Sequence, residues 1–136
     1  MAQTSQVSLG HARYVWSGKF TEADNGSTVA AIDVPANTWI PPYGVTVYIA
    51  EVFAGGTPSM NVGDGGTTNG WVPTADITEA TVGCYTGSAG DYSDEGRMYL
   101  TADTIDVIID DTTLTGGTGY IIVKMLDVSG LDIAAS

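Results

Sequence analysis

Hydrophobic and polar residues alternate along most of this 136-residue chain, and Gly, Pro, Asp, Asn or Thr interrupts the alternation every several residues. The clearest segment is 45–53, where Val and Ile alternate with Thr, Tyr and Ala. A period of two places successive side chains on opposite faces of a strand, and the helical period of 3.6 is almost absent. The pattern predicts eight or nine strands, drawn from residues 13–21, 28–34, 38–40, 45–53, 58–62, 81–86, 97–100, 104–110 and 120–128, with one helical turn at 74–77.

Turn signals separate these segments at a spacing of about 8–12 residues, which is typical of all-β folds. Asn25-Gly26 favours a turn with positive φ, and Pro35 ends a strand because proline lacks the amide donor that a sheet needs. Residues 120–126 are nearly continuously apolar, as in a strand covered on both faces. We expect an all-β, two-sheet antiparallel sandwich of jelly-roll or related Greek-key topology, with a closed barrel as the alternative. Residues 1–136 are expected to form a single domain with a flexible N-terminal arm at about residues 1–9 and a short C-terminal tail.

Charge narrows the possible partners. Sixteen Asp and Glu outnumber four Lys and Arg, which gives a formal net charge of −12. Nucleic-acid binding needs clustered cations, and Arg13, Lys19, Arg97 and Lys124 are dispersed. The same deficit argues against anionic membranes, and no apolar run is long enough to span a bilayer. The first residues lack a basic segment followed by an apolar one, so we expect no signal peptide and synthesis in a cytosol.

Candidate chemistry is sparse. His11, the single histidine and so the single candidate base for a Ser-His-Asp or Cys-His site, stands beside the expected N-terminal arm, where a solvent-exposed residue is the simpler explanation. One histidine and one cysteine are too few ligands for a zinc site. Cys84 stands in a strand-like segment, where a lone cysteine usually behaves as a small buried hydrophobic residue. We therefore expect no catalytic residues, no cofactor and no enzymatic activity.

The features that suggest calcium binding and sugar binding both have simpler explanations. The densest acidic loop, with Asp91, Asp94 and Glu95 as weak calcium candidates, lacks the spacing of a calcium-binding loop, and Asp is common in turns for backbone reasons. No metal site is therefore predicted. The three Trp residues could stack on sugar rings, although Trp in a small sandwich more often serves the core or an interface.

Several segments together resemble a known group of proteins. They are residues 31–40, the strand at 45–53, the segment 58–65, the loop containing Trp71, and residues 120–124. In order and in turn chemistry, residues 28–126 resemble small virion proteins encoded beside the major capsid protein of tailed bacteriophages. These proteins are described as cement, decoration or head-stabilising proteins.

The resemblance implies a jelly-roll-like sandwich on the outer surface of a phage head, where it would clamp neighbouring subunits after assembly in the host cytoplasm. The implied partners are the major capsid protein and further copies of the chain, as a dimer or trimer, with no nucleic acid and no membrane. The alternative is a carbohydrate- or receptor-binding module of a tail or head fibre, supported by Trp71 and the acidic loop. The interface candidates are Met1, Ala2, Gln3, Thr4, Ser5, Gln6, Val7, Trp39, Tyr43 and Trp71.

Overall fold

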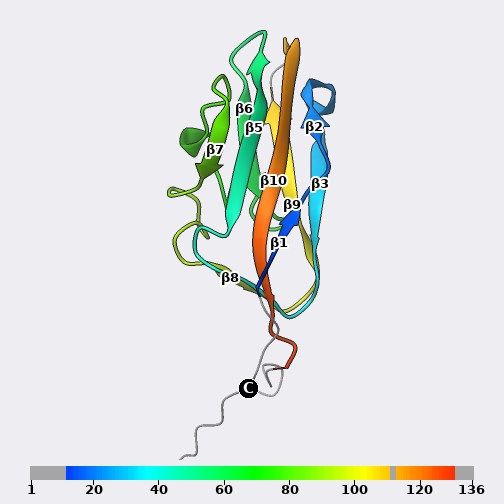
Figure 1. Cartoon of the computed structure of the whole chain (residues 1–136), viewed down its shortest axis with the longest axis vertical. Coiled ribbons are helices and arrows are strands. Elements are labelled where there is room, and N and C mark those ends of the chain that lie inside the picture. The colour runs from blue at the N-terminus through cyan, green and yellow to red at the C-terminus, as the bar shows by residue number, and fades with distance from the viewer. Residues whose placement is uncertain (1–11, 111–112, 131–136) are drawn as a thin grey trace, which may run out of the picture.

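The computed structural model describes residues 12–110 and 113–130, and within them two antiparallel β-sheets pack face to face (Figure 1). The all-β sandwich expected from the sequence is confirmed. The larger sheet contains β1 (Arg13–Trp16), β2 (Phe20–Thr21), β4 (Thr38–Ile40), β5 (Val45–Ala54), β7 (Gly83–Thr86), β8 (Arg97–Tyr99) and β10 (Gly116–Asp127). The smaller sheet contains β3 (Thr28–Val34), β6 (Ser59–Gly63) and β9 (Asp103–Asp110).

The long strand β10 organises the larger sheet. Ile122 pairs with Thr46 of β5 and also with Trp16 of β1, so β5 and β1 flank β10 on opposite edges. The strand order is β7-β5-β10-β4-β8, with β1 and β2 also paired to β10, and the smaller sheet runs β3-β9-β6. The chain passes repeatedly between the sheets, from β3 to β5, β6, β7, β9 and β10. This winding of an antiparallel sandwich is that of a jelly roll.

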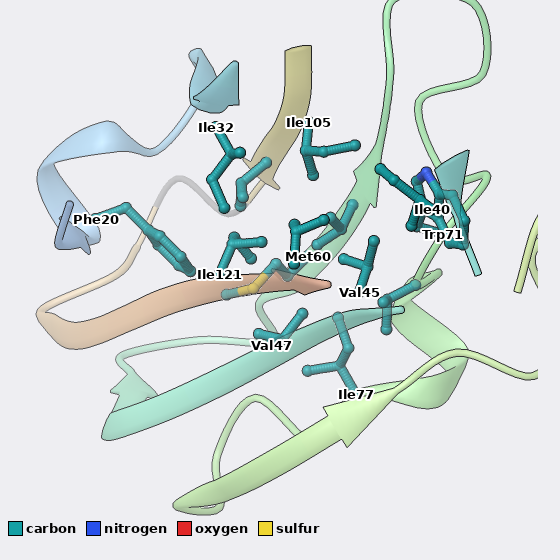
Figure 2. Close-up of a cluster of buried hydrophobic side chains, with 14 of the residues drawn as sticks. Phe20, Ile32, Ile40, Val45, Val47, Met60, Trp71, Ile77, Ile105 and Ile121 are labelled. Carbon is teal, nitrogen blue, oxygen red and sulfur yellow. The ribbon is translucent and has the colours of Figure 1, made fainter. Parts of the chain in front are cut away.

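The core lies between the sheets and follows from the alternation in the sequence (Figure 2). On β5 the residues Val45, Val47 and Ile49 are buried, while the side chains between them point outward. Burying one such aliphatic side chain contributes roughly 1.5–3 kcal/mol, so these positions determine which face of each strand turns inward. The same alternation buries Ile121, Val123 and Met125 on β10 and Ile105, Val107 and Ile109 on β9.

The glycines at the start of β10 are part of this core. The two Phe rings of β2 and β5, Phe20 and Phe53, stack with centroids 6.1 Å apart against this part of the strand. A Cβ atom at Gly119 would lie 2.5 Å from Phe20 Cζ, and one at Gly117 would overlap the Phe53 ring. The strand begins at Gly116, whereas the sequence, with its turn-like glycines, predicts a start at Tyr120.

The predicted strand at 13–21 is interrupted. β1 ends at Trp16 and β2 begins at Phe20, but the chain stays attached to β10 between them. The Ser17 amide donates to the Ile121 carbonyl, and the Ile121 amide donates to Ser17 Oγ, each at 2.8 Å. The predicted helical turn is a 3₁₀ turn, Thr74–Asp76, and a second one at Glu22–Asp24 was not predicted.

Candidate functional site

Three aromatic rings gather on the outer face of the larger sheet, the face that points away from the core. Tyr48 on β5 pairs directly with Tyr120 on β10, and their rings stack with centroids 6.1 Å apart. Trp16 on β1 lies beside both, at 6.5 Å from Tyr48 and 6.3 Å from Tyr120 in edge-on arrangements. Aromatic pairs at these separations attract each other beyond their simple burial, so the cluster is a defined structure rather than scattered exposure.

The outward positions of β10 extend this cluster along the sheet. Lys124 is paired with Tyr14, and its Nζ lies 5.9 Å from the Tyr14 ring centroid. Further along, Leu126 pairs with Trp39 of β4, which in turn pairs with Met98 of β8. We call the following set the outer aromatic face: Tyr14, Trp16, Trp39, Tyr48, Met98, Tyr120, Ile122, Lys124 and Leu126.

Charge distinguishes the two outer surfaces of the sandwich. The outer aromatic face contains Lys124 and no acidic residue, although the chain as a whole carries −12. On the smaller sheet, Asp33 and Asp110 are exposed and point outward, because their neighbours Val34 and Ile109 are buried. Asp106 is also on that side, largely covered, and burial raises the pKa of its carboxyl group. The middle of the larger sheet's outer surface is therefore apolar and aromatic, with the exposed Glu51 beyond it opposite Thr118 of β10, and the outer surface of the smaller sheet is acidic.

Exposure on the outer aromatic face is highest at two residues of β1, and most of its other members are half-buried. Tyr14 is 67% exposed and Trp16 57% exposed. Single exposed hydrophobic side chains are ordinary, but a contiguous apolar and aromatic patch marks an interaction surface. Trp and Tyr are also the residue types that dominate binding energy at protein interfaces.

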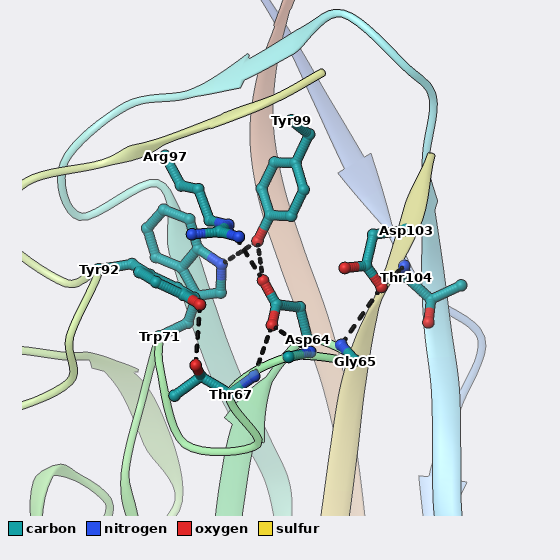
Figure 3. A network of polar contacts seen from close by, with 10 residues as sticks. Asp64, Gly65, Thr67, Trp71, Tyr92, Arg97, Tyr99, Asp103 and Thr104 are labelled. Carbon is teal, nitrogen blue, oxygen red and sulfur yellow. Dashed lines mark hydrogen bonds and ion pairs between the residues drawn. The ribbon is translucent and has the colours of Figure 1, made fainter. Parts of the chain in front are cut away.

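The densest polar cluster lies elsewhere and is buried (Figure 3). Asp64, with no exposed surface, accepts hydrogen bonds at Oδ1 from the amides of Gly66 (2.9 Å) and Thr67 (2.8 Å). Its Oδ2 accepts one from the Tyr99 hydroxyl at 2.8 Å, and that hydroxyl accepts one from Trp71 Nε1 at 2.9 Å. Burial is the main cause that raises the pKa of Tyr99, so its hydroxyl stays protonated and able to donate.

Arg97 closes this cluster from the solvent side. Its Nε is 3.3 Å from Asp64 Oδ2, an ion pair without hydrogen-bond geometry, and its guanidinium lies 4.4 Å from the centroid of the Tyr92 ring. The Tyr92 hydroxyl donates to Thr67 Oγ1 at 2.9 Å. The cluster therefore ties the loop after β6 to β8 and to the loop before it. Since its carboxylate has no exposed surface, we interpret it as architecture rather than as a site for a ligand.

The structure corrects the prediction for Trp71. This residue is 1% exposed because its neighbour Val72 forms a bridge to Val62, and its indole packs edge-on against Tyr92 with centroids 5.6 Å apart. Its side chain is therefore not available to a partner. Tyr43 is 55% exposed and Trp39 is half-buried on the outer aromatic face, so both reach the surface as an interface requires. Candidates outside the described residues are Met1, Ala2, Gln3, Thr4, Ser5, Gln6 and Val7, together with His11.

The acidic loop and the cysteine are both exposed. Asp91, Asp94 and Glu95 lie on a turn, and no group of three acidic, His or Cys side chains able to hold a metal ion occurs in the described part of the chain. Cys84 is exposed, contrary to the expectation of a buried residue. It pairs with Tyr48 on β5, and it is the half-buried Tyr85 next to it that packs against the core.

A shallow pocket of about 200 Å³ lies where β1 begins and β10 ends. Arg13, Thr38 and Asp127 are among its lining residues. The backbone amide of Ser129 donates to Asp127 and is the main cause that lowers the pKa of this carboxyl group. None of the described helices is long and apolar enough to cross a membrane.

Sequence reasoning did not select Tyr14, Tyr48 or Tyr120 as interface residues, and for Trp16 it left sugar stacking, the core and an interface open. The available signal was their position between aliphatic residues that form the core. Alternation shows that Tyr48 faces away from Val47 and Ile49. It does not show that this second face is left uncovered, because that depends on how the sheets pack.

Comparisons with known proteins place the fold. The chain matches no protein-family model and no curated protein. It is similar to a chain in the acidic stable capsid structure of Helicobacter pylori bacteriophage KHP30, with a TM-score of 0.66 and 11% identity over 88% of this chain and 90% of that one. It is equally similar to a chain in the capsid asymmetric unit of cyanophage Pam1, with a TM-score of 0.66 and 13% identity over 93% and 91%. The fold is thus one found in phage capsids.

Proposed function

We propose that this protein is a non-enzymatic virion structural protein, a cement or decoration protein that binds the outer surface of a phage head. It would stabilise contacts between major capsid protein subunits. The observation that carries the proposal is the outer aromatic face, displayed on a fold that is shared with chains of two phage capsids.

The chemistry of this face suits a protein partner. Desolvating Tyr14, Trp16 and Met98 releases apolar surface from water, and no carboxylate of the face has to be buried with them. Lys124 adds one cation that can meet an acidic group of the shell. The acidic smaller sheet would remain in solvent.

The size of the face fits a lattice better than an isolated complex. Six residue steps from Tyr120 to Leu126 span about 20 Å, and three adjacent strands with their side chains span about 20 Å. The resulting footprint of about 400 Å² is roughly half of what a standard interface buries per partner. A single contact is therefore expected to be weak. A protein that contacts two neighbouring subunits gains affinity from the second contact, and binding only the assembled lattice stabilises that lattice.

The test is binding to capsids of the encoding phage that lack this protein. Purified protein is added at increasing concentration, and the bound fraction is measured after sedimentation. We expect saturable binding at a lattice stoichiometry, and Trp16→Ala should weaken it about tenfold or more, as at an interface hot spot. Val82→Ala is the matched control, since Val82 is 54% exposed but is not part of the outer aromatic face.

The outcomes separate the two parts of the proposal. Absence of saturable binding by the wild-type protein would contradict the cement role. Equal binding by wild type and Trp16→Ala would leave the role standing and show that another surface makes the contact. A variant that lacks residues 1–7 tests the predicted arm in the same assay, where strand addition to the shell predicts weaker binding.

The exposed rings also favour one alternative, a carbohydrate-binding module. Trp16, Tyr48 and Tyr120 together offer rings on which a sugar could stack. The burial of Trp71 removes one of the two supports that the sequence gave to this function, and the other, the acidic loop, is exposed. A glycan array separates the two candidates. Saturable sugar binding that is lost in Trp16→Ala, without retention on capsids, would favour the module.

A further inference from the structure

Tyr43 occupies a backbone conformation that its side chain disfavours. It is the third residue of the turn Pro41–Gly44, which is closed by a 2.9 Å hydrogen bond from the Gly44 amide to the Pro41 carbonyl. Its φ is +57°, in the left-handed region. Pro at the second position and positive φ at the third are the pattern of a type II turn, where the third residue is normally Gly or Asn. A bulky side chain there is an outlier that calls for an explanation.

At a second position of the chain, positive φ falls on a residue type that commonly adopts it. Asn37 is the other described residue besides glycine with positive φ, at +59°. Asn tolerates this conformation because its short side chain can form local hydrogen bonds. Of these two positions with positive φ, position 37 has a residue type that adopts the left-handed conformation readily, and position 43 has one that does not.

The fold offers no packing reason for the Tyr43 ring. The side chain is 55% exposed, and among the described residues Tyr43 belongs neither to the core nor to the half-buried hydrophobic residues packed against it. The backbone at Tyr43 is nevertheless held in place. Its amide donates to the Ser93 carbonyl at 2.7 Å, and the next residues, Gly44 and Val45, are buried. The turn thus fixes the backbone that presents the ring to solvent, which lowers the entropy cost of using it as a contact.

The turn also adjoins the outer aromatic face. Pro42 and the Trp39 ring both contact Gly96: a Cβ built there would lie 3.0 Å from Pro42 Cδ and 2.7 Å from Trp39 Cη2. Trp39 belongs to the outer aromatic face, so the Tyr43 turn continues that face at the end of the sheet where β5 begins.

We propose that Tyr43 is a contact residue for the capsid shell, retained for binding although the folded chain would be more stable with glycine at this position. This inference rests on the proposed function and extends its interface from the sheet to the Pro41–Gly44 turn. Binding energy at interfaces concentrates in a few such preorganised aromatic side chains. Strain at an exposed residue is a known mark of sites where function outweighs stability.

The test compares three substitutions at this position with one at Asn37. Tyr43→Gly and Tyr43→Ala both remove the ring, but only glycine also relieves the left-handed conformation. After allowance for the greater freedom of glycine in the unfolded chain, we expect Tyr43→Gly to be about two- to fivefold more stable than Tyr43→Ala in the equilibrium constant of urea unfolding. Both should bind capsids about tenfold more weakly than wild type, and Tyr43→Phe should bind within about threefold of it.

Asn37→Gly is the matched control, because it introduces the same residue at positive φ without removing an aromatic ring, and it should bind capsids like wild type. Wild-type binding by Tyr43→Gly, with Trp16→Ala still impaired, would overturn the inference and leave the cement role intact. If Tyr43→Ala is as stable as Tyr43→Gly, the left-handed conformation at position 43 carries no cost, and the premise of the inference is overturned. If sedimentation velocity showed that Tyr43→Gly changes the oligomeric state of the free protein and not its capsid affinity, the ring would serve a contact between copies instead.

Discussion

The carboxylate of Asp64 is the point at which the network of Figure 3 is most vulnerable. In Asp64→Ala, the Tyr99 hydroxyl loses its acceptor in a buried place, and the amides of Gly66 and Thr67 lose theirs at a partly buried turn. The buried hydroxyl left unpaired costs about 1–3 kcal/mol, and each of the two amides costs less because water reaches the turn and the loop can relax. The ion pair adds less than about 1 kcal/mol, since the Arg97 side chain is 39% exposed and solvent screens it. We expect a total loss of about 3–5 kcal/mol in the free energy of unfolding.

Asp64→Asn should be milder, at about 1–2 kcal/mol, because the retained Oδ1 still accepts from both amides. Urea unfolding at neutral pH, followed by tryptophan fluorescence, measures all the variants, and Asp33→Ala on the exposed face of β3 is the matched control. If Asp64→Ala fails to fold, Tyr99→Phe gives a second measurement: it leaves the Trp71 Nε1–H without an acceptor and should cost about 1–2 kcal/mol. A loss in Asp64→Ala no greater than in Asp33→Ala would refute the reasoning, as would a larger loss in Asp64→Asn than in Asp64→Ala.

Three further predictions follow from single contacts. Gly119→Ala should cost about 1–3 kcal/mol in urea unfolding, because its Cβ would lie 2.5 Å from Phe20 Cζ, while Gly18→Ala, with no atom within 4 Å, should be close to neutral. Hydrogen bonds from the Ala89 amide, and then from the Ser88 amide, lower the pKa of Asp76 in the folded protein. The charged carboxylate therefore stabilises the fold above the unfolded pKa, and this contribution is lost as pH falls through the folded pKa. Asp76→Asn should therefore cost less than about 1 kcal/mol at pH 7, because solvent screens this accessible carboxylate, and almost nothing at about pH 2; equal losses at both pH values would contradict this. A bulky maleimide should label the exposed Cys84 in the native protein, and the label should abolish capsid binding because Cys84 pairs with Tyr48. Cys84→Ser should bind capsids and resist labelling. Full binding by the labelled protein would exclude that edge of the sheet from the interface.

The strands were predictable because their signal is local. Predicted strands 28–34 and 38–40 coincide with β3 and β4, and 45–53 falls one residue short of β5. Each strand segment contains its own alternation of apolar and polar residues, and proline and glycine lie at the ends of the segment. No information about distant segments is needed to recognise it.

The errors arise where distant segments decide the outcome. Trp16 and Trp71 are chemically identical, yet one is 57% exposed and the other 1% exposed. Trp71 is buried because the chain around it folds back on β6 beneath Tyr99, a contact between residues 28 positions apart. Gly117 and Gly119 likewise belong to a strand, and Phe53 and Phe20, from other strands, fill the space above them. The sequence period identifies which residues share a face, but the packing of the two sheets decides which face stays uncovered.

The acidic surface of the β3-β9-β6 sheet has a consequence for the particle as a colloid. A shell covered through the outer aromatic face would display Asp33 and Asp110 of every copy to the medium. With a formal charge of −12 per chain, each added copy would increase the electrophoretic mobility of the particle toward the anode. Decorated heads would repel one another more strongly at low ionic strength than bare ones, and salt would reduce this repulsion over a Debye length of about 10 Å at 0.1 M. The same coat that braces the shell would thereby keep newly made virions dispersed.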